Sequence, residues 1–461
     1  MPYALDDLGR AVTGQLYDVA CGCDRSVPPA RDSFLTWCQP GIPFRAADLD
    51  FAGGELGAGS VDDAFAFSRL VDFVPAAQTA YTHDRQQRCF TPDAGGRLST
   101  VYGDVLRSAR VVHSGLSDDE QGRVERLGGL LRTTRTVLDV ATGEPRRITD
   151  DGPMLKAYNE KLAAYLAAVL RCNGGRVAAR GGARLDWAGN AERYRTQVES
   201  GMADWISVGY RNEVDQIDAY IDQATGRDLV HWRRALVDML DGAVLQAGGQ
   251  CRRFHHTVPV PSGFAGGDGW TRHTFTHHAI DSGAHQEPRS WRAGGPLNFE
   301  LAAFGDGTTA PASDGGTVES FELHLELRPV LISRPWFYPP LLRNRGWTCD
   351  QQLSDGGDPP AGSLIGYPST ILFARDIRIE SADFAAAYAR FARSVGDSAG
   401  IGWGPFWLGG RHRRGGRELQ LAASVDARGV SIPELQIFGF VNQQLGKTPN
   451  PLPGLDQGRF V

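Results

Sequence analysis

The chain has 461 residues, of which 41% are hydrophobic and 22% are charged, and its formal net charge is −6. This composition is too apolar for a disordered chain and too charged for an integral membrane protein. The acidic balance argues against nucleic acid as a partner, because general polyanion binders carry a basic excess. We therefore expect a globular protein of roughly two to four domains of about 100–200 residues each.

The N-terminal residues include acids where a secretory signal peptide needs a basic region followed by an apolar one. The longest uninterrupted apolar stretch, 162–170, is much shorter than the ~18 residues that span a bilayer. Seven cysteines, an odd number, are spread along the chain, which is not the pattern of a disulfide framework, and no CxxC pair occurs. These features predict a cytoplasmic protein with free cysteines and no membrane partner.

Residues 1–96 are predicted to form short helices and loops that pack on the rest of the chain. Apolar residues recur at spacings of three and four from Leu5 to Val19, which indicates an amphipathic helix. A second helix is expected over 61–74, where Pro75 ends it.

Residues 97–249 contain the clearest helical patterns. Ser117 and Glu120 have the spacing of a capping box, in which each side chain satisfies the free backbone N–H of the other residue. The apolar repeat that follows runs from Val124 to Leu138, so we expect one continuous helix over that range.

A helical hairpin is expected in the second part of this region. Pro153 is tolerated in a first helical turn, and the apolar repeat that follows it stops at a Gly/Ala/Arg-rich segment, 173–182, which we predict to be a turn. The repeat resumes over 187–221, which implies a helix on the order of 50 Å long. Gly226 ends this helix, and 229–244 forms one more. The simplest packing is a coiled-coil-like antiparallel hairpin within a helical bundle.

Residues 250–461 are predicted to form a sandwich-like antiparallel β-domain with one helix, 382–395. From Phe321 to Arg328, apolar residues alternate with Glu322, His324 and other polar residues, as in a half-buried strand. Further strands are expected over 369–379, 404–408, 418–425 and 434–441. The predicted fold class is therefore α+β, because helices and strands segregate instead of alternating.

Histidines are dense in one part of this β-domain, since six of the eleven lie between His255 and His285. Imidazole is the commonest metal ligand, and three histidines can form an open zinc site. His273 and His277 share a face on either a helix or a strand, and His285 follows them. These three residues are the candidate metal ligands, with zinc as the metal. The alternative interpretation is a set of exposed strand and loop histidines.

An aromatic segment follows the strand that contains Phe321. Its candidate interface or ligand residues are Arg334, Trp336, Phe337, Tyr338 and Trp347. Arginine, tryptophan and tyrosine dominate interface hot spots, and aromatic residues also line pockets for small ligands. The alternative interpretation is a strand end that plugs the core.

Two fragments imitate catalytic motifs without their structural context. The sequence at 396–400 fits GxSxG, but a predicted helix precedes it where a nucleophile elbow needs a strand. The GKT at 446–448 lacks the first glycine of a P-loop, and Pro449 follows it. No catalytic residue is predicted.

The C-terminal half resembles a set of uncharacterised bacterial and fungal proteins with a helical N-terminal half and a β-rich C-terminal half. The resemblance lies in RPWF at 334–337, Trp347, and the segments 368–379, 404–409 and 433–441. It implies the same division of the chain into helical and β-rich parts. It implies no activity and no catalytic residue.

The leading functional hypothesis is a non-enzymatic structural or interaction protein, which binds a protein partner or itself through the helical hairpin and the aromatic strand end. One alternative is an enzyme or small-ligand binder with a histidine–metal site in the β-domain. Another is a pore-forming toxin, for which 162–170 is the candidate insertion element.

Overall fold

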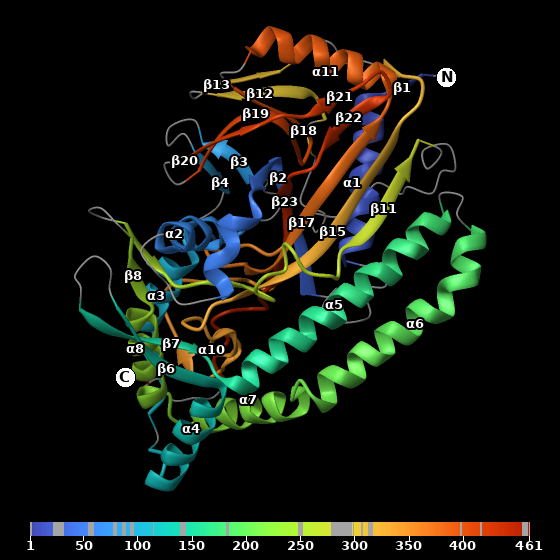
Figure 1. The fold of residues 1–461 in the computed structure, drawn as a ribbon. Helices are drawn as coiled ribbons and strands as arrows, with labels where there is room; N and C mark the ends of the chain where they lie inside the picture. The colour runs from blue at the N-terminus through green and yellow to red at the C-terminus, as the bar shows by residue number, and fades with distance from the viewer. Residues whose placement is uncertain are drawn as a thin grey trace.

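The computed structural model describes residues 2–460 except for 22–31, 54–59, 77–80, 85–88, 93–95, 114, 139–143, 181–183, 248–251, 278–296, 298, 306–307, 312–316, 397–398, 415–416 and 454–459. Helices lie mainly in the N-terminal half and strands mainly in the C-terminal half (Figure 1). Apart from the parallel pair β2–β3, the paired strands are antiparallel, and the predicted α+β class is confirmed.

The largest sheet joins strands from both ends of the chain, in the order β10-β15-β17-β23-β2-β3-β4. The strands are β2 (Ser33–Phe44), β3 (Tyr81–Asp84), β4 (Cys89–Pro92), β10 (Val258–Val260), β15 (Glu322–Ser333), β17 (Gly366–Glu380) and β23 (Leu435–Gln444). Further strands extend it: β11 (Thr271–Thr276) pairs with β15, β22 (Gly429–Ile432) with β17, and β21 (Ser424–Val425) with β22. The alternation predicted around Phe321–Arg328 is confirmed, because apolar residues of β15 are buried and polar ones are half-exposed.

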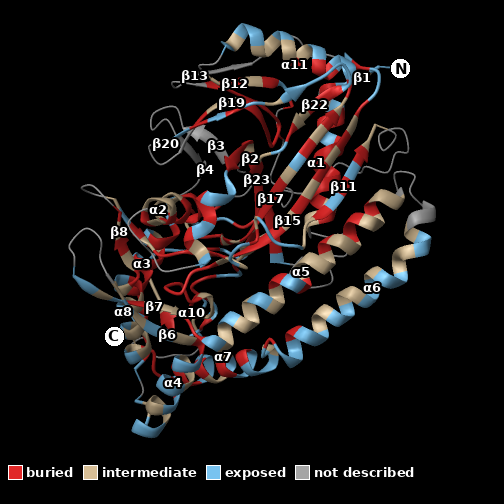
Figure 2. Ribbon diagram, viewed as in Figure 1, coloured by how far each residue is buried: buried red, intermediate tan, exposed pale blue. Residues whose placement is uncertain are grey.

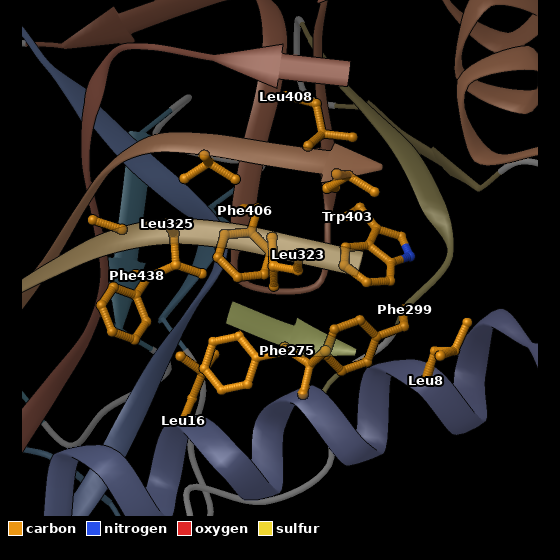
Figure 3. Close-up of a cluster of buried hydrophobic side chains, with 14 of the residues drawn as sticks. Leu8, Leu16, Phe275, Phe299, Leu323, Leu325, Trp403, Phe406, Leu408 and Phe438 are labelled. Atoms are coloured by element: carbon orange, nitrogen blue, oxygen red, sulfur yellow. The ribbon is translucent and has the colours of Figure 1, made fainter. Parts of the chain in front are cut away.

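A second sheet packs near the first, in the order β13-β12-β18-β19-β20. Its strands are β12 (Leu301–Gly305), β13 (Thr308–Pro311), β18 (Gly400–Trp403), β19 (Phe406–Arg414) and β20 (Arg417–Leu421). Helices α1 (Leu5–Cys21) and α11 (Ala382–Val395) complete the enclosure of one apolar core, and the bounds of α11 are those predicted. Figure 3 shows this core, with Leu8 and Leu16 of α1 opposite Leu323, Trp403 and their neighbours.

The helical part lies against one end and one side of the large sheet. Its helices are α2 (Ser60–Val71), α3 (Leu98–Ser108), α4 (Asp118–Leu131), α5 (Pro153–Arg180), α6 (Arg184–Ser207), α7 (Arg211–Thr225), α8 (Val230–Gly242) and α10 (Pro339–Arg343). Helices α5 and α6 form the expected hairpin, in which α5 lies between the sheet and α6 (Figure 1). Figure 2 shows that α6 keeps a largely exposed outer side.

Short elements connect these parts. They are β1 (Tyr3–Ala4), η2 (Ala46–Gly53), β5 (Arg110–Val111), β6 (Arg132–Leu138), β7 (Pro145–Asp151), β8 (Val244–Gln246), β9 (Arg253–His255), β14 (Thr317–Val318) and β16 (Trp347–Thr348). The capping box of Ser117 and Glu120 is confirmed at the start of α4. The expected helix over Val124–Leu138 is wrong beyond Leu131, because the β-branched run that follows forms β6 and pairs with β7.

The expected turn at 173–182 is also wrong, because α5 continues to Arg180. The glycines in this segment do not form a turn; they allow neighbouring side chains to pack closely against α5. A Cβ on Gly174 would lie 2.0 Å from the ring of His273, and one on Gly175 would lie 2.9 Å from Tyr194 of α6. Tertiary contacts to both neighbours therefore outweigh the weak helix propensity of glycine.

Other boundaries also differ from the predictions, and at two of them a residue with positive φ is the cause. The helix expected over 187–221 is interrupted at 208–210, where Tyr210 has a positive φ of 54° and separates α6 from α7. The strand expected over 404–408 begins at Phe406, because Gly404, with φ of 51°, forms the turn between β18 and β19. Both residues occupy the left-handed region, which the apolar spacing does not reveal.

Trp403 is fully buried in the core of Figure 3 and contacts the rings of Phe299 and Phe384 at centroid distances of 4.9 and 5.3 Å. We expect Trp403→Ala to lower the free energy of unfolding by about 3–5 kcal/mol, since it leaves a cavity in a well-packed core. Denaturant unfolding measures this change. Trp187→Ala is the control, because Trp187 is only half-buried at the end of the hairpin. An equal loss in both variants would contradict the assignment of this core.

Candidate functional sites

The aromatic segment predicted as an interface or ligand surface lies in the interior of the protein. Arg334, Trp336, Phe337, Tyr338 and Trp347 are all buried. The indole nitrogen of Trp336 donates to Thr257 Oγ1 at 3.3 Å, and that of Trp347 donates to the carbonyl of Leu341 at 2.9 Å. These side chains join the helical core to the large sheet, as in the alternative of a strand end that plugs the core. In this conformation they offer no surface to a partner.

Arg334 holds two separate backbone segments together inside this core. Its guanidinium donates to the carbonyl of Pro368 at 2.6 Å and to that of Val71 at 2.9 Å. Burial lowers the pKa of Arg334 to about 10, and the nearby Asp72 partly offsets this effect. The guanidinium of Arg334 therefore stays charged at neutral pH, and its hydrogen bonds hold the two backbone segments together.

A second buried polar group connects β7 to β15. Ser333 Oγ donates to Asp151 Oδ2 at 2.5 Å, and Asn159 Nδ2 donates to the same oxygen at 3.0 Å. Desolvation raises the pKa of Asp151. Ser333 Oγ donates to a carboxylate and not to an imidazole, and His256 Nε2 lies 3.8 Å from the oxygen of a different carboxylate, Asp150 Oδ1, so these three groups are not arranged as serine, base and acid for nucleophilic catalysis.

The predicted histidine ligands are not brought together by the part of the chain that the structure describes. His273 is buried on the core side of β11, and His277 follows that strand. His277 Nδ1 lies 3.1 Å from the carbonyl oxygen of Phe321, and its ring lies 5.2 Å from that of Tyr3. His285 lies outside the described residues.

Among the described residues, one group of His, Cys, Asp and Glu has the proximity of a metal site, and it consists of Glu322, His324 and Glu380. Their ligand atoms lie within 4.8 Å of one another on the outer face of the large sheet. The alternation in the sequence placed Glu322 and His324 on a polar face. It did not indicate Glu380, because the register of β15 on β17 brings that residue opposite Glu322.

A third feature is the elbow between α6 and α7, defined here as residues 205–211. Ile206, Val208 and Tyr210 are exposed there, by 36%, 53% and 42%. The apolar spacing predicted a continuous seam through this segment and gave no indication of the elbow. A bulky residue with positive φ has no reliable signal in a single sequence.

Comparison with protein-family models, with curated proteins and with solved structures gives no match for this chain. Across the described ranges, none of the helices combines the length and the apolar composition that crossing a bilayer requires.

His273 predicts a pH dependence of stability. Its Nε2 is buried without a hydrogen-bond partner, Leu325 of β15 lies opposite it, and the facing turn of α5 carries Asn173, Gly174 and Arg176. Desolvation lowers the pKa of His273 from 6.5 to about 4. Below pH 6.5 the unfolded chain takes up a proton here that the folded chain does not. His273 therefore contributes a fall of about 1.4 kcal/mol per pH unit in the free energy of unfolding as the pH decreases through this window.

Denaturant unfolding of wild type and His273→Gln between pH 6.5 and about 4 measures this contribution. We expect the variant to lose stability less steeply on acidification, because glutamine does not titrate. Phe275→Leu is the matched control and should keep the wild-type slope, because it changes a buried side chain of the same strand without removing a titratable group. Identical slopes in wild type and His273→Gln would contradict the prediction.

Proposed function

We propose that the protein is a non-enzymatic interaction protein that assembles with further copies of itself through the elbow between α6 and α7. The observation that carries this proposal is a concentration of exposed apolar side chains. Six large hydrophobic side chains are exposed among the described residues, and three of them lie between Ile206 and Tyr210. Such a group on an otherwise charged surface is typical of a site that another protein covers.

The elbow is held in one conformation by contacts behind it. Trp205 is buried, its ring stacks on Tyr165 at 5.8 Å, and the guanidinium carbon of Arg211 lies 4.6 Å from its centre. A Cβ on Gly209 would lie 2.8 Å from Lys161 Cβ, so the chain passes tightly over α5. A surface that is already ordered loses little entropy on binding, which favours association.

The charges around the elbow suit a second copy of the same chain. Lys161 lies 3.7 Å from Asp204, and Arg211 lies 3.9 Å from Asp215. Each pair contains one positive and one negative side chain, so the elbow carries no net charge from these groups. Two elbows that meet across a two-fold axis would therefore not repel each other through them. A rim of one sign would instead favour a partner of opposite charge.

The other surfaces considered give less support. The aromatic strand end, expected to be a second contact surface or a ligand pocket, is buried and has no part in the proposal. The apolar segment 162–170, the insertion element of the toxin hypothesis, lies in the middle of α5, which packs between α6 and the sheet. Among the described residues, a membrane function therefore has no feature that favours it over self-assembly.

Light scattering coupled to size-exclusion chromatography tests the proposal over a series of protein concentrations. We expect the wild-type chain to show a multiple of its 50.0 kDa mass that increases with concentration. Val208→Asp places a charge in the centre of the elbow and should return the mass to 50.0 kDa. The side chain is exposed, so the substitution should leave the fold intact.

Leu452→Asp is the control, because Leu452 is as exposed as Tyr210 but lies outside the elbow. It should assemble like the wild type. The proposal fails if the wild type stays a monomer at the highest concentration. It also fails if Val208→Asp assembles as well as Leu452→Asp.

A further inference from the structure

We propose that Glu322, His324 and Glu380 bind one divalent transition-metal ion of the zinc type on the outer face of the large sheet. This site is separate from the elbow and from the histidines that sequence density suggested. Its three side chains are 31–41% exposed, so an ion can reach them from solvent.

The strand register places two carboxylates against each other. Glu322 of β15 is directly opposite Glu380 of β17, and neighbouring like charges on adjacent strands destabilise a sheet. Since their ligand atoms and that of His324 all lie within 4.8 Å of one another, a cation between them would replace this repulsion with attraction.

His324 is oriented as a ligand would be. Its Nδ1 lies 3.0 Å from Thr274 Oγ1 on β11, which holds the ring from the side away from the carboxylates. Its Nε2 lies 3.7 Å from Glu322 Oε1. Metal-binding histidines commonly use one ring nitrogen for the metal and the other for a hydrogen bond that fixes the ring.

Glu380 is also held in place. Arg378 Nε donates to Glu380 Oε1 at 2.7 Å, and Arg378 Nη1 donates to Ser431 Oγ at 3.1 Å. Asp426 Oδ2 lies 3.6 Å from the same guanidinium. The arginine neutralises part of the charge of Glu380, but a carboxylate has a second oxygen, and ligating carboxylates are commonly hydrogen-bonded in this way.

The donor set selects the kind of ion. Calcium and magnesium prefer oxygen ligands throughout, whereas zinc accepts imidazole together with carboxylates. At zinc–ligand distances of about 2.0–2.1 Å, neighbouring tetrahedral ligand atoms lie about 3.4 Å apart. The 3.7 Å between His324 Nε2 and Glu322 Oε1 is close to that separation. Three protein ligands leave one position for water on this half-exposed face.

Calorimetric titration of the chelator-treated, full-length protein with Zn²⁺ tests the site. We expect wild type to bind one Zn²⁺ per chain, and His324→Gln and Glu380→Gln each to weaken this binding at least about tenfold. Glu326→Gln is the matched control, because Glu326 lies on the same strand and face, two residues beyond His324. It should bind within about twofold of wild type.

Two further measurements separate this site from other histidines and from misfolding. Co²⁺ should give a visible absorption band in wild type and in His277→Gln, but not in His324→Gln. The reason is that the visible absorption of bound Co²⁺ depends on the side chains that coordinate it. Zn²⁺ should raise the Tm of wild type and leave that of His324→Gln unchanged, because an ion stabilises only the state that binds it.

The proposal is overturned if wild type binds no Zn²⁺. It is equally overturned if Zn²⁺ binds His324→Gln and Glu380→Gln as tightly as wild type, since the ion then lies elsewhere. The outcome does not depend on the oligomeric state, so failure of the elbow proposal would leave this test intact.

Discussion

The pairing of β2 with β23 is the interaction on which the rest of the structure depends. It joins 33–44 to 435–444 and places an N-terminal strand inside a sheet of the C-terminal half. The buried side chain of Asn442 reinforces it by donating to Thr36 Oγ1 at 2.8 Å and to the carbonyl of Phe34 at 3.2 Å. Separating these strands would leave buried polar groups without partners, each at a cost of about 1–3 kcal/mol.

Two cores meet on this strand pair. On one face, Trp37 stacks on Phe438 at 6.0 Å within the core that α1 and the second sheet enclose. On the other, Phe440 contacts Phe73 at 5.1 Å, in the core that α2 covers. The polar outer face with Glu322 and His324 begins where that second core ends. The position of the candidate metal site therefore follows from how far the helical part covers the sheet.

The sequence predicted those elements whose determinants are local. The capping box at Ser117, the helix 382–395 and the alternation in β15 all depend on residues within a few positions of one another. In α5, where the prediction of a turn failed, distant partners decided the outcome. The glycines of α5 are helical because His273 and the α6 aromatic side chains occupy the space beside them. Such information is absent from the spacing of apolar residues.

The candidate sites also differ between what local sequence indicates and what distant contacts decide. The residue types around Trp336 are those of an interface, but burial is a property of the assembled fold and placed them in the core. Conversely, Glu380 is a single acid at the end of a strand, and only the register of β15 and β17 relates it to Glu322 and His324. A single sequence can identify ligand-type residues without indicating which of them meet.

The pairing of β2 with β23 also determines when during biosynthesis the large sheet can be completed. Phe34 and Asn442, which bond across it, are 408 residues apart. At roughly 5–20 residues per second, a ribosome takes on the order of 20–80 s to make the intervening chain. During that interval β2, a strand that is almost wholly buried in the folded protein, has emerged without the neighbour that will cover its edge. Until the last long strand leaves the ribosome, nascent chains of this protein therefore carry an unpaired strand edge, which is a site prone to aggregation.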